Sequence, residues 1–134
     1  MKKFCLVLAM VLAMMACRAG KSIETVKYDT SNQALTLEQM RDAIARGCLI
    51  NQWLVSEVDS NTIEAATTVR GKHHVVVTIP YTSNHYEIKY KSSSNMNYKM
   101  KDGNPVIHPA YNEWVRTLDT SIKYEIGASK YGKK

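Results

Sequence analysis

The sequence begins with an apolar run that decides how much of the chain can belong to a folded domain. Residues 4–16, FCLVLAMVLAMMA, carry no charge and follow Lys2 and Lys3. As a helix this run would be about 20 Å long at about 1.5 Å per residue, whereas a membrane span needs about 20 residues. A basic start followed by a short apolar run is typical of a secretory signal peptide. We therefore expect residues 1–16 to be a signal peptide, and the fold to come from the rest of the 134-residue chain.

The end of this run predicts the attachment of lipid. Met14-Met15-Ala16-Cys17 resembles the bacterial lipobox, in which two apolar residues and a small residue precede a cysteine. Ordinary signal cleavage prefers small residues three and one before the cut, and Met14 is too large for it. We therefore expect Cys17 to be the acylated N-terminus that binds membrane lipid, an attachment that more than one acyl chain makes stable. The alternative is a cut nearby that leaves Cys17 as a free thiol.

The residue after Cys17 bears on the destination of the chain. An Asp directly after the lipidated cysteine would resemble a signal for retention in the inner membrane, but this chain has Arg18 there. In a Gram-negative host we therefore expect a protein of the cell envelope, lipid-anchored to the outer membrane and facing the periplasm. Residues 17–35 are interpreted as the lipidated N-terminus and a polar tether, in which 22–28 is the one candidate strand.

The net charge of +6 raises the question of a nucleic-acid partner. Two of the lysines belong to the leader, and Lys130, Lys133 and Lys134 lie at the C-terminus. A nucleic-acid-binding protein would concentrate basic residues on one face of its fold, so we expect no nucleic acid as a partner. Residues 127–134 are interpreted as a basic flexible tail, which is either simply solvated or weakly attracted to an anionic membrane.

Residues 36–126 are expected to form one α+β domain that begins with a helix. Thr36 and Gln39 have the spacing of a capping box at the start of this helix. Gly47 is a candidate for its end. Cys48 falls on the apolar face of the helix and is expected to be an inert, buried thiol.

Four strand-like runs follow in close order, and a last helix comes after them. The runs span 53–59, 62–70, 73–81 and 86–91, and connections this short favour an antiparallel meander. The last helix opens at Pro109. Each helix has a single apolar stripe, so each needs one partner surface. The predicted fold class is therefore α+β, with a four-stranded antiparallel meander and two helices, one before and one after, packed on one face.

Short phrases in the second half of the chain resemble a known family. VRGKHHVVVTIPY, NHYEIKYKSSSNMNY and IHPAYNEWVRTLD are similar to phrases of small proteobacterial envelope lipoproteins of unknown function. The likeness covers roughly residues 35–126. It implies a lipidated N-terminus and an α+β domain, and it brings no known activity. One departure is that Gly47-Cys48-Leu49 stands where an aromatic-flanked Arg-Gly-Trp often follows the first helix.

The sequence offers little for catalysis or metal binding. His73 and His74 are neighbours in a strand, so they point to opposite faces and cannot easily share one ion; we expect no metal site and no cofactor. A nucleophilic pair of Cys48 with a histidine is less expected than an inert thiol, because Cys48 lies on an apolar helix face. We therefore expect a non-enzymatic binding or assembly module. The alternatives are a structural lipoprotein without a specific ligand and a small periplasmic enzyme.

The loop at 92–108 is the predicted binding surface. It is long for a connection in a compact domain, and such loops are usually functional or disordered. We expect it to fold back over the edge of the sheet, with side-chain bonds to the backbone fixing its turn. The residues expected to fix the turn or to border the surface are Tyr90, Ser94, Asn95, Tyr98 and His108. The candidate partners are an envelope protein and peptidoglycan.

Overall fold

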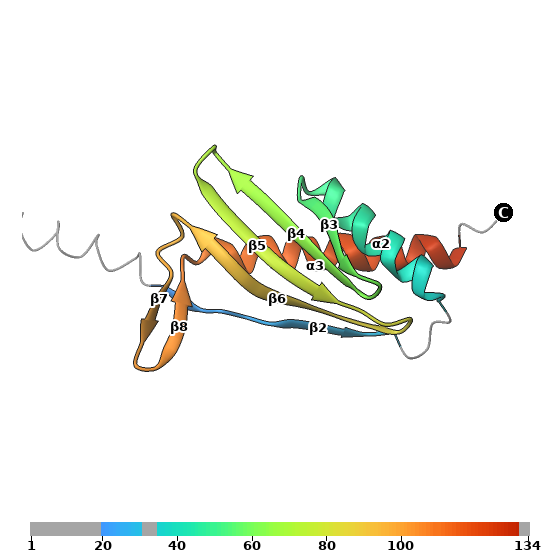
Figure 1. Ribbon diagram of the computed structural model, residues 1–134, viewed down its shortest axis with the longest axis horizontal. Coiled ribbons are helices and arrows are strands. Elements are labelled where there is room, and N and C mark those ends of the chain that lie inside the picture. The colour runs from blue at the N-terminus through green and yellow to red at the C-terminus, as the bar shows by residue number, and fades with distance from the viewer. Residues whose placement is uncertain (1–19, 31–34, 132–134) are drawn as a thin grey trace, which may run out of the picture.

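The computed structural model describes residues 20–30 and 35–131 (Figure 1). The signal peptide at 1–16, the lipidation of Cys17 and the last three residues of the basic tail lie outside the described residues. The described part contains two helices, α2 (Leu37–Ile50) and α3 (Ala110–Tyr131), and eight strands.

The strands form two antiparallel sheets. The larger sheet has five strands in the order β2-β6-β5-β4-β3. The smaller sheet has three strands in the order β1-β8-β7 and lies at the end of the molecule where the described chain begins (Figure 1). The strands are β1 (Lys21–Ser22), β2 (Val26–Asp29), β3 (Leu54–Asp59), β4 (Thr62–Val69), β5 (His73–Pro80), β6 (His85–Ser94), β7 (Lys99–Lys101) and β8 (Asn104–Ile107).

The structure confirms an α+β fold with antiparallel sheets and two helices, but the four-stranded sheet was wrong. Strands β3 to β6 do pair consecutively, as a meander should. A fifth strand, β2, then pairs with β6, with Tyr28 opposite Tyr86. The candidate strand at 22–28 overlaps β2, but its place in the sheet was not predicted, because its partner β6 lies far along the chain.

The predicted loop at 92–108 is also largely regular structure. Strand β6 continues to Ser94, and a β-bulge near its end leaves Lys91 without a direct partner between Tyr90 and Ser92. Strands β7 and β8 then form a hairpin around Asp102 and Gly103, whose φ angles are 51° and 79°. Asp-Gly is the favoured pair for a two-residue hairpin turn, because both positions need a positive φ. This signal was present in the sequence.

Regular structure extends beyond residues 36–126 at both ends. Within the predicted tether, β1 pairs with β8 and β2 pairs with β6. The tail predicted at 127–134 is helical over its first five residues, because α3 continues through Gly127 to Tyr131. A glycine inside a helix costs about 1 kcal/mol relative to alanine and does not by itself end the helix.

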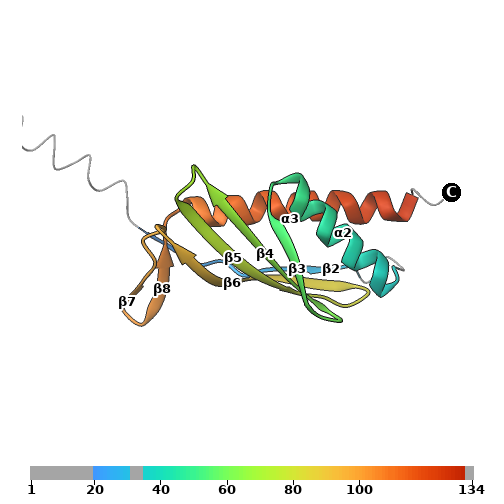
Figure 2. The same ribbon diagram turned by 45° about the horizontal axis from the view of Figure 1, so that its top comes forward.

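Both helices cover the same face of the five-stranded sheet, as predicted (Figure 2). The buried face of the sheet carries Ile63, Ala65, Val75, Val77, Ile79, Tyr86 and Ile88. The helices contribute their apolar stripes to the same core, including Met40, Ile44, Val115, Leu118, Ile122 and Ile126. The other face of the sheet is left with polar and charged side chains, such as Lys89 and Lys91.

Helix α2 starts as its sequence predicts and ends later. The hydroxyl of Thr36 accepts a hydrogen bond from the backbone N–H of Gln39, and the Gln39 side chain accepts one from the N–H of Thr36. Gly47 does not end the helix, which continues to Ile50. Gly47 instead faces Ile122 of α3, where a Cβ atom would lie 2.8 Å from the Cα of Ile122. Glycine is needed there because the two helix backbones approach closely.

Cys48 is buried, as predicted. Its side chain is inaccessible in the core between α2 and the sheet. Burial raises the pKa of its thiol to about 12, and a thiol with a raised pKa is a poor nucleophile near neutral pH.

Candidate functional site

Asn95 ties the end of β6 to the β4–β5 turn. Its Nδ2 donates a hydrogen bond to the backbone carbonyl of Lys72 at 2.8 Å, and its own carbonyl accepts one from Nδ1 of His73 at 2.8 Å. Its φ of 58° is left-handed, a conformation that asparagine tolerates. The predicted bond from Asn95 to a backbone group therefore exists, but it joins two elements and does not close a local turn. Ser94 lies in the sheet opposite His74.

The predicted surface is only partly assembled. The rings of Tyr90 and Tyr98 stack in parallel with centroids 5.0 Å apart. Tyr98 is exposed, and Tyr90 is half-buried. Tyr98 and His108 do share a hollow of about 290 Å³, which is also lined by Gly20, Asn97 and Lys99. Tyr90, Ser94 and Asn95 do not line this hollow. Tyr98 and His108 are thus brought together, and the other three residues support or flank the surface.

A second cleft of about 310 Å³ opens on the other side of His108, between the β4–β5 hairpin and the start of α3. Arg70 and His73 line the cleft from the hairpin. His108 lines it from a position two residues before α3, and Glu113 and Trp114 line it from the first turns of α3. Apolar contacts complete its lining through Val69, Met96 and Ala110. The cleft exists because the tip of one hairpin meets the beginning of one helix.

Hydrogen bonds fix different tautomers for the two histidines of this cleft. Nδ1 of His73 bonds a carbonyl oxygen, which only accepts, so this nitrogen carries a proton, and in the neutral ring Nε2 has the lone pair. Nδ1 of His108 accepts a hydrogen bond from the N–H of Ala110 at 3.1 Å, so in the neutral ring Nε2 carries the proton. The two rings lie 6.4 Å apart between centroids. The cleft therefore offers one acceptor and one donor side by side.

The cleft also presents one charge of each sign. Arg70 comes from the β4–β5 turn and Glu113 from α3. Neither forms a salt bridge with another residue in the described part of the chain. Both side chains are exposed and can meet charges on a ligand.

A smaller hollow of about 140 Å³ continues the cleft along α3. Val69 and Trp114 line both, and Trp53 lines the smaller one together with Asn51, Thr67 and Thr117. Both tryptophans of the chain thus border one groove, which we call the α3 groove: the 310 Å³ cleft together with the 140 Å³ hollow. Indole rings provide apolar contact area with a polar N–H, which suits a ligand of mixed polarity.

The sequence alone did not single out Arg70 or Glu113. Trp114 is half-buried and lines the same cleft. Its place beside Trp53 and the β4–β5 turn depends on tertiary packing, and no spacing in the sequence signals it. The one local signal was His108 followed by Pro109, which places a histidine where a helix starts.

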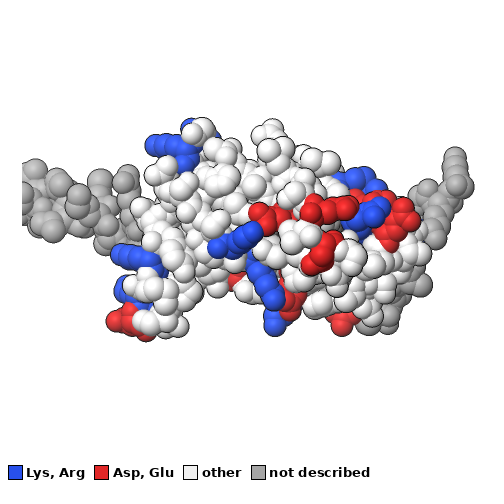
Figure 3. Space-filling model, in the orientation of Figure 1, with Lys and Arg blue, Asp and Glu red and all other residues white. Residues whose placement is uncertain are grey.

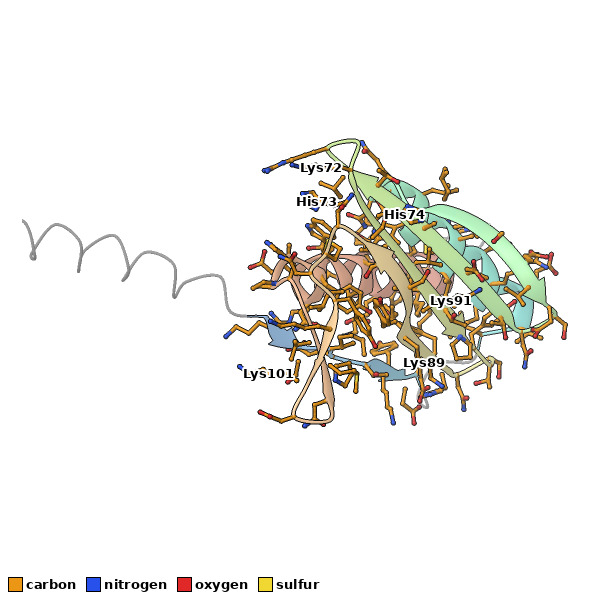
Figure 4. The ribbon with its side chains drawn as sticks, turned by 60° about the vertical axis from the view of Figure 1, so that its left-hand side comes forward. Lys72, His73, His74, Lys89, Lys91 and Lys101 are labelled. Carbon is orange, nitrogen blue, oxygen red and sulfur yellow. The ribbon has the colours of Figure 1, made fainter. Side chains whose placement is uncertain are left out.

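The two adjacent histidines of β5 have different surroundings. His73 and His74 point to opposite faces, as predicted: His73 bonds Asn95 and lines the cleft, while Nδ1 of His74 lies 3.0 Å from the hydroxyl of Thr68 (Figure 4). Within residues 20–30 and 35–131 no three His, Cys, Asp or Glu side chains are grouped to hold a metal ion. The lining of the cleft contains no serine, threonine or cysteine. The arrangement is suited to hydrogen bonding and charge pairing with a ligand.

The chain matches no protein-family model, and no curated protein is significantly similar to it in sequence. In the part of the chain that the structure describes, neither helix is long and apolar enough to span a membrane.

Proposed function

We propose that this chain is an exported envelope protein, lipid-anchored through Cys17 to the outer membrane, and that its periplasmic domain is a non-enzymatic binding module. The apolar leader, the lipobox-like Met14–Cys17 and the resemblance to small envelope lipoproteins support the location. The α3 groove supports the binding role. The single observation that carries this role is the 310 Å³ cleft, in which Arg70, Glu113 and two histidines of opposite hydrogen-bonding character converge.

The lining of the groove indicates the chemistry of its ligand. Arg70 can bind a carboxylate, and Glu113 can bind an amine. The N–H of His108 and the lone pair of His73 can bind an amide C=O and N–H. Trp114 and Met96 supply apolar contact between these polar groups. A short peptide with free carboxylate and amine groups has all of these features. Two envelope sources offer it, namely the stem peptides of peptidoglycan and an exposed segment of another envelope protein.

Tryptophan fluorescence provides a direct test. Replacing Trp53 by phenylalanine leaves Trp114 as the only tryptophan, so its emission reports on the groove. Titration with soluble peptidoglycan fragments tests the first source, and a library of peptides from envelope proteins tests the second. We expect one of them to shift the emission of Trp114 in a saturable manner. Saturable binding that leaves Trp114 emission unchanged would place the ligand elsewhere.

Matched variants separate the groove from general charge effects. Arg70→Gln and Glu113→Gln each remove one charge from the cleft, and each should weaken binding about tenfold or more, because hydrogen bonds to charged groups contribute about 1.5–3 kcal/mol. Lys130→Gln is the control, because it removes one exposed cation from the far end of α3. If none of the envelope fragments binds, the alternative of a structural lipoprotein without a specific ligand is favoured.

A further inference from the structure

The basic residues at one end of the domain differ from those elsewhere. Lys27 and Lys89 form salt bridges with Glu87, and Lys91 forms one with Glu64. Six other described basic residues form no salt bridge with a described residue. One of them is Lys130 in the last turn of α3, and the other five are Lys21, Arg70, Lys72, Lys99 and Lys101. We call these five the basic end. Their side chains remain free to meet anions from outside the domain.

The five residues lie at the same end of the fold. Lys21 is in β1 and Lys99 and Lys101 are in β7, and both strands pair with β8. Arg70 and Lys72 lie in the β4–β5 turn, which Asn95 ties to the end of β6. Figure 4 shows Lys72 and Lys101 projecting from this end, whereas Lys89 and Lys91 lie over the outer face of the sheet.

The charges of the domain are polarised along its long axis. Asp102 and Glu113 are acidic residues near the basic end, and they are outnumbered by its five cations. Many of the acidic side chains lie toward the opposite end, where Figure 3 shows most of the red surface. Such a distribution orients a molecule beside a charged surface.

The β7–β8 hairpin at the basic end is amphipathic. Lys99 and Lys101 alternate with Met100, whose side chain is 59% exposed. Tyr98, just before β7, is also exposed, and its hydroxyl lies 4.0 Å from the sulfur of Met100. This combination suits the interface of a bilayer. The lysine ammonium groups can meet lipid phosphates, while the exposed methionine and tyrosine side chains reach the boundary of the acyl chains.

The length of chain before β1 identifies what faces this end. Cys17 precedes Lys21 by four residues, which span at most about 14 Å when fully extended. An anchor at Cys17 therefore holds β1 and its neighbours close to the bilayer. The described C-terminal end of α3 lies at the far end of the molecule (Figure 1), so Lys130 is not among the described basic residues nearest the anchor.

We propose that the basic end docks on an anionic phospholipid surface, so that the anchored domain lies against the membrane in one orientation. This proposal rests on the lipid anchor at Cys17 in the proposed function. Each basic residue near an anionic surface raises the ratio of docked to undocked molecules about fivefold. The β4–β5 turn then faces the membrane.

Lysine acetylation on vesicles tests this orientation. The full chain is extracted from cell membranes and reconstituted in vesicles of phosphatidylcholine, with and without phosphatidylglycerol, and treated with a water-soluble acetylating reagent. Intact-mass measurement first reports whether Cys17 carries lipid. We expect Lys21 and Lys72 to be acetylated several-fold more slowly on the anionic vesicles, with Lys89 and Lys123 unchanged. Equal rates for Lys21 and Lys72 on both kinds of vesicle would overturn the proposal.

Two double variants provide the matched comparison. Lys99→Gln with Lys101→Gln should lower the docked-to-undocked ratio about 25-fold and remove the protection of Lys21. Lys89→Gln with Lys91→Gln removes the same charge from the sheet face and should retain that protection. Equal behaviour of the two pairs would refute a specific docking surface. If Cys17 carries no lipid and the chain is soluble, the lipid anchor is refuted. Sedimentation of the two double variants with the same vesicles then tests separately whether the basic end binds anionic phospholipid.

Discussion

Replacing Gly47 by alanine tests the closest contact between the two helices. A Cβ atom at position 47 would lie 2.7 Å from Cγ1 of Ile122 and 2.8 Å from its Cα and backbone nitrogen. Two of these atoms belong to the backbone, so rotation of a side chain cannot relieve the contact. Helix α3 has to move, and the core residues Leu118 and Ile126 have to move with it.

The expected loss of stability follows from two opposing effects. Overpacking in a core costs about 1–3 kcal/mol, while alanine gains about 1 kcal/mol over glycine inside a helix. Because the clash involves backbone, we expect the upper part of that range and a net loss of about 1–2 kcal/mol. For a domain of this size the thermal midpoint should fall by roughly 4–8 °C.

Gly127→Ala is the matched control for this variant. Gly127 is also inside a helix, but nothing lies within 4 Å of the point that a Cβ atom would occupy there. The same substitution should therefore stabilise the domain at this position, by up to about 1 kcal/mol. Thermal unfolding followed by circular dichroism measures both variants. A Gly47→Ala domain as stable as the Gly127→Ala domain would refute the close packing of α2 on α3.

Further predictions concern buried groups and processing. Tyr86→Phe removes the 2.6 Å hydrogen bond from the Tyr86 hydroxyl to buried Asp119 and should cost about 1.5–3 kcal/mol in urea unfolding; an unchanged midpoint would contradict this. Cys48 should react with a disulfide reagent at pH 8 only after unfolding, because burial raises its pKa to about 12; fast reaction of the folded chain would show an accessible thiol. The raised pKa means that the folded state favours the neutral thiol. This contribution to stability is complete below the ordinary pKa of 9.0 and is lost as the pH rises toward 12. Between these values the unfolding free energy of Cys48→Ala should therefore fall less steeply with pH than that of the unchanged chain. Cys17→Ser should abolish incorporation of a clickable fatty acid in cells, and equal labelling of both chains would contradict lipidation.

The sequence predicted the parts of the fold that depend on local chemistry. The capping box at Thr36 and the burial of Cys48 follow from spacing within one helix, and the consecutive pairing of β3 to β6 follows from short connections. These features depend on residues close in the chain, where periodicity and capping rules apply. The Asp102-Gly103 hairpin belonged to the same class and was overlooked.

The remaining features depend on contacts between distant residues. Pairing of Tyr28 with Tyr86 adds β2 to the sheet, and the contact of Gly47 with Ile122 makes a candidate helix end into a packing site. The binding site has the same origin. His108 was identified from the loop, but Arg70 and Glu113 reach the cleft from a hairpin tip and a helix that only the tertiary fold brings together.

Photo-crosslinking in cells tests the central claim, that the domain binds an envelope ligand in the α3 groove. A photoreactive phenylalanine replaces Ala110, which lines the cleft, and in a control chain it replaces Tyr124, which is 73% exposed on α3 and lines neither hollow of the groove. The account predicts that irradiation attaches the first chain to peptidoglycan or to one envelope protein, and that it leaves the control chain free. Absence of any adduct from position 110, or the same adducts from position 124, would contradict it.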